Sequence, residues 1–453
     1  MIRFLRHLKF ELSLAKSALL KVPGFSATVI ATLSVTLGAL ICIFSLNHLL
    51  LVKSLPYPNA DQLVVLQQSY TSEGETYSGS QSAPGMLLWY KNQKVFDKFA
   101  LVFDHKQLVP DHPEQPNALI NFVTPEYFSL LKPTMHLGRV IDESEGLETH
   151  QAVVVLSYQT WQKWYQSDID IIGRKTMIGH VSYKVIGVTS ENFIAPANRN
   201  NEAPDFWLPW DYQGLDITHW GVMTRALSSI GTLKSGVSPL QAASTLGVML
   251  NEKFIASGAA ESGDTAGAKV LSLTEVIVGG SSKVALLLLS GVVGLLLIAV
   301  TNVTNLFLSR AAQKQRTMAI QAALGAKPNH LFISMLAESL ILSVIAGALG
   351  LLIASWGFVL LDELASNQLP RISELGLDSV TLIFTGLIIV ALSAIFAKLS
   401  SRVVNYDLLQ TQLQSSGKGS GLQVSKRIRN FLIAIQVALA TLLLAGASVV
   451  IEK

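Results

Sequence analysis

The sequence predicts an α-helical membrane bundle of five spans, joined to a mixed α+β domain that lies outside the membrane. Half of the 453 residues are hydrophobic and only 14% are charged, against about 25% in ordinary soluble proteins, and the mean hydropathy is +0.43. The apolar residues gather in five runs, each near the roughly 20 residues that a helix needs to cross a bilayer. Between the first two runs lies segment 53–282, which is long enough to fold as a separate water-soluble domain.

The five runs predict five transmembrane helices. The first is an uncleaved anchor, because it is longer than the roughly 7–15 apolar residues of a signal peptide. The third is longer than a span requires and carries Glu338, so we expect its inner end to project or tilt. The chain stops at Lys453, directly after the fifth run, which predicts a truncated chain. The runs are residues 27–52, 284–308, 331–361, 380–397 and 431–451.

Residues 1–26 predict an amphipathic helix on the inner face of the membrane. Apolar residues recur at helical spacing, and basic residues lie elsewhere around the helix, where they can approach anionic headgroups. Pro23 and Gly24 break this helix from the first span. The alternative is a helix that simply continues inward. The apolar positions are Leu5, Leu8, Leu12, Ala15 and Leu19.

The charges of the connections predict the orientation. Three connections are basic, namely 1–26, the segment 309–330 and the linker 398–430, and the positive-inside rule places them in the cytosol. The connection 362–378 is acidic, and segment 53–282 has 16 basic and 23 acidic residues, a net charge of −7. These two are therefore expected outside. The N-terminus is cytosolic in this topology, and every connection agrees with it.

Segment 53–282 predicts strands and short helices. Residues 152–156 and 183–188 are β-branched runs typical of strands, and residues 158–165 favour a short aromatic helix. Ser238-Pro239 opens a longer helix, and residues 257–267 predict a flexible linker. Four tryptophans are expected in the core rather than in a ligand site: Trp161, Trp164, Trp207 and Trp210.

Composition and motifs exclude several classes of function. The net charge of +3 is too small for a nucleic-acid binder, and the single cysteine, Cys42, excludes a disulfide framework or a Cys-rich metal site. Cys42 lies in an apolar run and is expected to be a buried hydrophobe. No catalytic signature or phosphate-binding glycine loop occurs, and SSGKGSG at 415–421 lacks the spacing of one. We therefore expect no enzyme, no catalytic residues and no cofactor.

One cluster in the outer segment has the residue types of a metal site. Asp104-His105 and Asp111-His112 could bind a divalent metal if a hairpin brought them together. Turns rich in Asp, His and Pro are much commoner than such sites, so we expect an exposed turn and no metal.

The spans carry features of a packed bundle. Thr301, Asn302, Thr304 and Asn305 place polar groups in the second span, where they need partners on another helix. Small residues four apart permit close backbone contact: Ser290 and Gly294 in the second span, and Ala346, Gly350 and Ala354, with Gly347 beside them, in the third. Glu338 has two interpretations: a functional intramembrane carboxylate, or an interfacial residue that reaches the headgroups.

The segment 309–330 is helix-forming, basic and free of acidic residues. It is stopped at Gly325, with Pro328 after it. A short helix there could dock into a groove of a soluble partner, and the alternative is a solvated positive-inside loop.

In ordered combination these residues resemble the MacB and FtsX superfamily of ABC permeases. The blocks that carry the resemblance are KVPGFSATVIATLSVTLGALICIFSLNHLLLVKSLPYPNADQLV, FVTPEYFSLLKPTMHLGRVIDESE with VVVLSYQTWQKWY and IGRKTMIGHVSYKVIGVTSENF, NVTNLFLSRAAQKQRTMAIQAALGAKPNHLFISMLAESLILSVIAGALG, and RIRNFLIAIQVALATLLLAGA. They resemble, in turn, the first span, a periplasmic core domain of the MacB type, the second and third spans with a coupling helix, and the first span of a second copy. The chain thus resembles a tandem permease cut after that span.

The resemblance implies a function and partners. A permease of this family pairs with a cytosolic ABC ATPase, here a separate polypeptide, and transmits its work to the outer domain in the bacterial inner membrane. A membrane-fusion protein and a second permease half or subunit are further implied partners, besides the lipid bilayer. Carried over by position, the residues that would couple to the ATPase are Arg310, Lys314, Arg316, Gln321, Gly325 and Lys327. Residues of functional or packing importance within the membrane are expected to be Glu338, Asn302, Asn305, Gly347 and Gly350.

The coupling segment departs from the family pattern. RTMAIQAALGA has Thr317-Met318 where an acidic residue is common and Gln321 in place of an arginine. The main alternative function is a non-transporting sensor or scaffold whose outer domain binds a peptide, a lipoprotein or a cell-wall enzyme regulator. A membrane-anchored hydrolase is a weaker third hypothesis.

Overall fold

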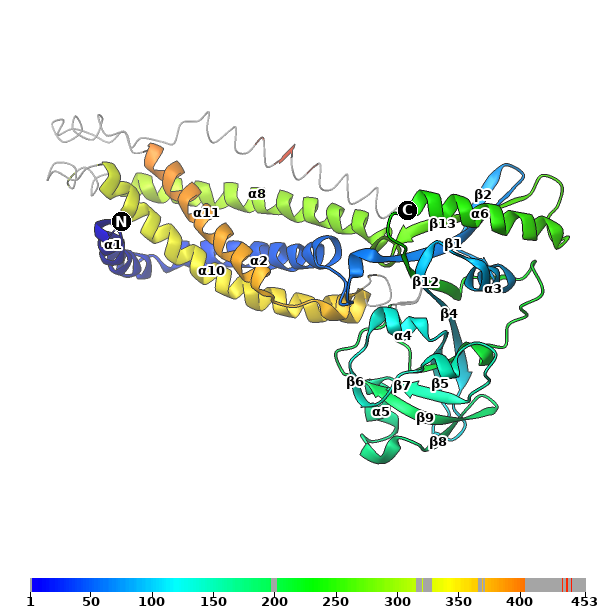
Figure 1. The fold of residues 1–453 in the computed structure, drawn as a ribbon. Helices are drawn as coiled ribbons and strands as arrows, with labels where there is room; N and C mark the ends of the chain where they lie inside the picture. The colour runs from blue at the N-terminus through cyan, green and yellow to red at the C-terminus, as the bar shows by residue number, and fades with distance from the viewer. Residues whose placement is uncertain are drawn as a thin grey trace. The chain divides into compact units, whose positions relative to one another are not determined.

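The computed structural model describes residues 2–196, 202–314, 320, 328–365, 369, 371–403, 434, 437–438 and 441. The chain divides into two compact units, shown as ribbons in Figure 1. The helical unit comprises residues 1–52, 280–366 and 371–453, and the sheet unit comprises residues 53–279 and 367–370.

The helical unit contains five described helices: α1 (Ile2–Leu20), α2 (Pro23–Asn47), α8 (Ser281–Gln313), α10 (Pro328–Ala365) and α11 (Ser379–Val403). A π-helical turn, His48–Val52, extends α2, and a 3₁₀ turn, Ile372–Glu374, precedes α11. Among the described residues, four helical segments are long and apolar enough to cross a membrane: Pro23–Val52, Ser281–Gln313, Phe332–Ala365 and Ser379–Ser401. They correspond to the first four expected spans. The fifth, 431–451, lies almost wholly outside the described residues.

The expected break between the first two helices is present, because α1 ends at Leu20 and α2 begins at Pro23. The apolar stripe of α1 is used for packing against protein. Ala15 and Leu19 are buried and Leu12 is half-buried, and α1 lies against α10 (Figure 1). The side chains that the sequence assigned to a membrane-facing stripe thus contact the bundle over this part of α1.

The bundle is held by an apolar interior. Helix α2 packs against α10 and α8, and α11 packs against the same two helices. Aromatic rings join neighbouring helices, with Phe307 of α8 stacked on Phe396 of α11 at 5.2 Å between centroids. The buried core residues of α2 include Val29, Leu33, Leu37, Leu40 and Ile41.

Helix α8 continues beyond its expected end. The sequence ended this span at Leu308, before the first cation, whereas α8 runs to Gln313 and includes Arg310. Burial of Arg310 is possible because a carboxylate of another helix meets it, a partner that the local sequence does not display.

Within the described residues, the sheet unit is built on an eleven-stranded sheet in the order β13-β1-β12-β4-β5-β10-β7-β9-β6, with β2 beside β1 and β8 beside β9. Its strands are β1 (Leu63–Ser72), β2 (Glu75–Ser78), β4 (Phe96–Leu108), β5 (Asn117–Val123), β6 (Met135–Gly138), β7 (Val153–Leu156), β8 (Lys175–Ile178), β9 (Val181–Thr189), β10 (Phe206–Pro209), β12 (Leu227–Leu233) and β13 (Thr265–Ser272). A small second sheet pairs β3 (Gln81–Ser82) with β11 (Met223–Thr224). The helices are α3 (Ala83–Asn92), α4 (Glu126–Leu131), α5 (Tyr158–Trp164), α6 (Pro239–Ala256) and α7 (Leu273–Val278).

The strands and helices expected in this unit are present as β7, β9, α5 and α6. Ser238 caps α6, because its hydroxyl accepts a hydrogen bond from the backbone N–H of Gln241 at 3.2 Å. The expected flexible linker 257–267 is wrong at its end, since β13 begins at Thr265 and pairs with β1. Its small residues carry no strand signal, and the ladder with β1 and the cover of α6 decide the conformation.

Both faces of the large sheet bury apolar side chains. One core includes Trp161, Trp210 and Phe206, with Trp164 packed against it, and the other includes Trp207 and Tyr127. The four tryptophans expected in the core therefore do pack there.

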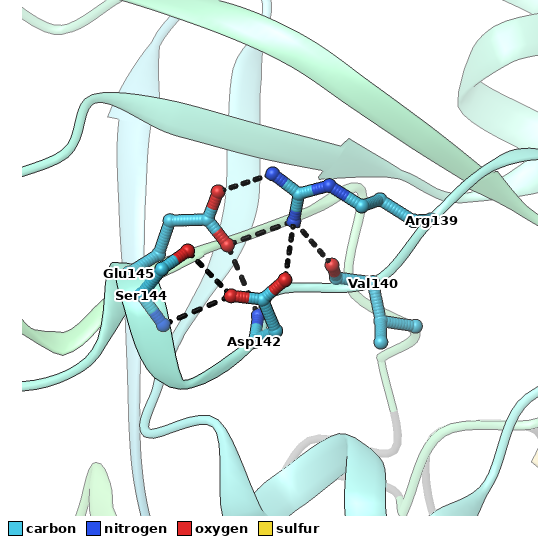
Figure 2. Close-up of polar contacts among 5 residues, drawn as sticks. All are labelled: Arg139, Val140, Asp142, Ser144 and Glu145. Atoms are coloured by element: carbon cyan, nitrogen blue, oxygen red, sulfur yellow. Dashed lines mark hydrogen bonds and ion pairs between the residues drawn. The ribbon is translucent and has the colours of Figure 1, made fainter.

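A polar cluster fixes the loop that follows β6. Figure 2 shows the forked guanidinium of Arg139 between Glu145 and Asp142. Glu145 also accepts the backbone N–H of Asp142, and Asp142 accepts that of Ser144, so the two carboxylates close a capping box. These hydrogen bonds and the arginine lower the pKa of the Asp142 carboxyl, the bonds from Ser144 most.

Candidate functional site

Three charged residues meet at one end of the helical unit. Arg310 and Lys314 lie one turn apart at the end of α8, and Glu338 lies in α10. Cations near a helix C-terminus are stabilised by the helix dipole, and Glu338 approaches from the helix on the other side of segment 315–327. We call Arg310, Lys314 and Glu338 the ion cluster.

Two members of the ion cluster, Arg310 and Glu338, are buried, and the cluster joins several helices. Arg310 Nε lies 3.2 Å from Glu338 Oε2, and Lys314 Nζ contacts Oε1 of the same carboxylate. Arg310 also donates to the carbonyl oxygen of Ala18 in α1 at 3.3 Å, and its guanidinium carbon lies 4.8 Å from the ring centroid of Phe25 in α2. The side chains of Arg310 and Glu338 are only 9% and 11% exposed. One arginine thus ties α1, α2, α8 and α10 together.

Glu338 faces protein rather than lipid headgroups. A buried carboxylate is costly unless cations and hydrogen bonds compensate it, and both of its oxygens have a cationic partner here. Of the two interpretations given to Glu338, the interfacial one does not fit, since the side chain points into the bundle between α8 and α10.

The structure separates the residues expected to couple to an ATPase. The guanidinium of Arg310 is buried against Glu338, Ala18 and Phe25. Lys314 is one-third exposed at the helix end. Arg316, Gln321, Gly325 and Lys327 lie outside the described residues.

The polar residues of α8 have different surroundings. Asn302 is exposed on the surface of this chain and Asn305 is half-buried, whereas Thr301 and Thr304 are buried. Thr301 donates to Leu297 O of its own helix at 2.7 Å, so its hydroxyl is satisfied without the second helix that the sequence analysis required.

The glycines of α10 lie at close helix contacts. A Cβ on Gly350 would stand 3.1 Å from Leu37 Cβ and 3.2 Å from the backbone nitrogen of Gly38, both in α2. A Cβ on Gly347 would stand 2.4 Å from Ile389 Cδ1 in α11. Gly347 and Gly350 therefore lie where α10 closely approaches α11 and α2, respectively.

A second small-residue surface, on α2, was not predicted from the sequence. Ser34, Gly38 and Cys42 follow one another at four-residue spacing and face the small residues of α10. A Cβ on Gly38 would lie 2.6 Å from Ile353 Cγ2, and a Cβ on Gly357 would lie 3.1 Å from Cys42 Sγ. The same spacing rule applied to the first span could have found this surface.

The Asp and His residues of the sheet unit have structural roles. Asp111 accepts the backbone N–H of Met177 at 3.0 Å, and the ring of His112 packs against Trp164 at 5.4 Å between centroids. Asp104 and His105 belong to β4 rather than to a turn. In the described part of the chain, no group of three or more His, Cys, Asp or Glu is placed to hold a metal ion.

Asp104 is a half-buried acid. Burial raises the pKa of its carboxyl from 3.8 to about 7, because desolvation disfavours the charged form. Its strand neighbour across the ladder is Asn121 of β5, itself buried.

The raised pKa of Asp104 predicts a pH-dependent stability. The folded state holds this proton more tightly than the unfolded state, so the favourable contribution is complete below about pH 4 and is lost as the pH rises to about 7. We expect Asp104→Asn to gain stability over the unsubstituted protein across this interval, by at most about 4 kcal/mol. All tryptophans except Trp356 lie in the sheet unit, so urea unfolding followed by tryptophan fluorescence measures it. A stability difference that does not change between pH 4 and 8 would contradict the assignment.

Two family matches, one after the other along the sequence, cover most of the chain. Residues 26–247 match the MacB-like periplasmic core domain, and residues 289–402 match the FtsX-like permease C-terminal family. The chain belongs to the MacB/FtsX-like family of ABC permeases. The ion cluster lies within the second match of this permease, and most of the sheet unit lies within the first.

The MacB/FtsX-like permease is similar to longer proteins. It is 25% identical over 238 residues to a probable export ATP-binding/permease protein of Pseudomonas fluorescens, which covers 52% of this chain and 34% of that protein. It is 22% identical over 295 residues to the macrolide export ATP-binding/permease protein MacB of Rhodopseudomonas palustris, covering 65% of this chain and 42% of that protein. The matched part therefore spans less than half the length of these relatives. Among solved structures, the periplasmic region of MacB from Actinobacillus actinomycetemcomitans covers 48% of this chain and 91% of that chain, at 12% identity and a TM-score of 0.35.

The family assignment confirms the fold class in outline. The MacB/FtsX-like permease combines apolar membrane helices with a mixed α and β periplasmic core domain, which is the sheet unit. The second match is to an FtsX-like permease family, which forms the permease component of ABC transporters.

Proposed function

We propose that this chain is the permease subunit of an ABC-type export or force-transmitting complex, driven by a separate cytosolic ATPase. The ATPase docks on the segment between α8 and α10, and its closing movement is carried by the helical unit to the periplasmic sheet unit. The observation that carries the proposal is the ion cluster, which binds the two helices flanking that segment to each other and to α1 and α2.

The ion cluster suits transmission of force. A movement applied to segment 315–327 reaches α8 and α10 directly, and the buried pair Arg310–Glu338 makes these helix ends move together. Close contact between α2 and α10 at Gly38 and Gly350 extends the connection to the helix that leads into the sheet unit. Packed interfaces of this kind transmit displacement because they resist compression.

The proposed orientation places the N-terminus and segments 309–330 and 398–430 in the cytosol. Basic connections on one side and acidic ones on the other support it. A second permease half or subunit, and a membrane-fusion protein in the periplasm, complete the proposed complex.

Acidic substitution of Arg316 and Lys327 tests the ATPase docking. We expect Arg316→Glu/Lys327→Glu to lower at least tenfold the amount of ABC ATPase that co-purifies with the full chain from native membranes. The reason is that two acidic side chains replace two basic ones in the docking segment. Mass spectrometry quantifies the recovered ATPase. Arg310 is left intact, since its substitution would disturb the bundle. The matched control is Lys398→Glu, an exposed cation near the end of α11. Undiminished recovery of the ATPase with the double variant would remove the docking assignment.

Labelling of introduced cysteines tests the orientation separately. Cys42 is buried and is the single cysteine of the sequence, so a cysteine placed at Ser78 or Ser416 is labelled against a low background. An impermeant maleimide should label Ser78→Cys in intact spheroplasts and Ser416→Cys only after lysis. Labelling of both in intact spheroplasts would contradict the topology.

A further inference from the structure

The last turns of α2 have an unusual backbone. The α-helix ends at Asn47 and continues as the π-helical turn His48–Val52, directly before the first residue of the sheet unit, Lys53. A π turn is rare, because its hydrogen bonds join residues five apart and fit the backbone less well than those of an α-helix. We therefore expect contacts from outside the helix to stabilise this π turn.

One buried arginine supplies such a contact. Arg371 Nη1 donates to the carbonyl oxygen of Leu49, within the π turn, at 3.0 Å. The same guanidinium binds Glu374 with two parallel hydrogen bonds, Nε to Oε1 at 2.8 Å and Nη2 to Oε2 at 3.0 Å. The side chains of Arg371 and Glu374 are 5% and 8% exposed. Glu374 therefore holds the fork in the orientation in which its third nitrogen reaches Leu49.

The same segment contacts α2 at two more points. Ser45 donates from its hydroxyl to the carbonyl oxygen of Gly376 at 3.0 Å, and His48 Nδ1 lies 3.2 Å from Asp378 Oδ2. Contacts at Ser45, His48 and Leu49 cover the transition from α-helix to π turn.

The backbone of Arg371 is itself held in a costly conformation. Its φ is +63°, in the left-handed region that costs a residue with a side chain about 1 kcal/mol or more. This conformation caps the 3₁₀ turn Ile372–Glu374 and places Glu374 beside the guanidinium. The left-handed backbone of Arg371, the burial of its side chain and its bidentate pair with Glu374 together place its guanidinium at the end of α2.

We propose that residues 371–378, between α10 and α11, form a latch that holds the end of α2 in its π-helical form, with Arg371 as the positioning residue. The role of the latch rests on the proposed function. Through the latch, α10 and α11 contact the chain segment that enters the sheet unit. Movement of the bundle then reaches that unit through the π turn. Release of Arg371 from Leu49 would uncouple the two helices from the end of α2.

Hydrogen–deuterium exchange of the full chain in lipid nanodiscs tests the latch without nucleotide or ATPase. We expect Arg371→Gln to accelerate amide exchange in residues 48–53 at least tenfold, because the π turn loses its external donor. Arg371→Lys should give partial protection, since one ammonium group cannot span Glu374 and Leu49 as the fork does. The matched control is Lys91→Gln, which removes an exposed ion pair of the sheet unit and should leave exchange at 48–53 unchanged.

A charge-swapped variant tests whether the hydrogen bond from Arg371 protects the π turn or whether an ion pair between positions 371 and 374 is enough. Arg371→Glu/Glu374→Arg keeps two opposite charges but removes the donor at position 371, so exchange at 48–53 should stay fast. Full protection in the swapped variant, or unchanged exchange in a folded Arg371→Gln protein, would overturn the latch. Transmission of force to the sheet unit is tested separately, in the complex of the chain with its ATPase. If ATP leaves amide exchange in the sheet unit unchanged there, the proposed function fails. The latch still stands if the variants above confirm it.

Discussion

Replacing Gly350 with leucine is expected to separate α2 from α10. Even a single Cβ at this position would stand 3.1 Å from Leu37 Cβ and 3.2 Å from the backbone nitrogen of Gly38, and backbone cannot move aside as a flexible side chain can. Overpacking of a tight interface typically costs about 1–3 kcal/mol, and a whole leucine at a backbone crossing should exceed that range. The helices would have to part or shift along much of their contact.

Cys42 reports this separation. It is buried, it is the protein's single cysteine, and it faces α10 at Gly357. We expect Gly350→Leu to accelerate modification of Cys42 by a maleimide about 100-fold in detergent, since each factor of ten corresponds to about 1.4 kcal/mol of opening free energy. Gly350→Ala should have a smaller effect.

Gly291→Leu in α8 and Gly386→Leu in α11 are the matched controls. Both glycines are helical, and an added Cβ would meet no atom within 4 Å. Labelling of Cys42 should remain slow in both. Slow labelling in Gly350→Leu as well would show that the contact between α2 and α10 is not as close as the structure has it.

Removing the carboxylate of Glu338 is expected to destabilise the helical unit by about 3–5 kcal/mol, the usual cost of leaving a buried charge without its partner. In Glu338→Leu, Arg310 stays enclosed by α1, α2 and α10, and the partners it retains among the described residues are Ala18 O and the ring of Phe25. The melting temperature, followed by far-ultraviolet circular dichroism in detergent, should fall accordingly.

Two further variants identify the cause. Arg310→Met/Glu338→Leu removes both charges and should recover much of the lost stability, because an apolar pair of similar size avoids the desolvation cost. Lys314→Ala should cost less than about 1 kcal/mol, since this side chain is one-third exposed and Arg310 still pairs with Glu338. If Glu338→Leu melts at the same temperature as the unsubstituted protein, the ion cluster does not stabilise the bundle.

Much of the architecture could be predicted from the sequence. The spans followed from runs of apolar residues, and the break at Pro23 followed from the properties of proline. In the sheet unit, β-branched runs predicted β7 and β9, whereas β13 was missed because the Ala and Gly residues near its start do not favour a strand and adopt one by pairing with β1. The four-residue spacing of Ala346, Gly350 and Ala354 predicted close packing of α10, but it did not identify the helices on the other side.

The sequence predicted which residues matter at the candidate site, but it did not predict that Arg310 and Glu338 contact each other. Glu338 was singled out because a carboxylate inside an apolar span is functional by default, whereas Arg310 was assigned to an ATPase-facing surface by its position in the family resemblance. The two residues meet only because α8 continues past its apolar end and α10 returns beside it.

The amino-acid sequence by itself determined which segments are apolar enough to enter a bilayer, which connections are basic, and that one long segment forms a separate α+β domain, since these depend on the hydration of each residue and its near neighbours. The tertiary structure alone decided the meeting of Arg310 with Glu338, of Gly38 with Gly350 and of Arg371 with Leu49. The last pair is separated by 322 positions. Such contacts depend on how helices cross in space, and the free energy of a buried charge or a close backbone approach exists only once the second helix is there.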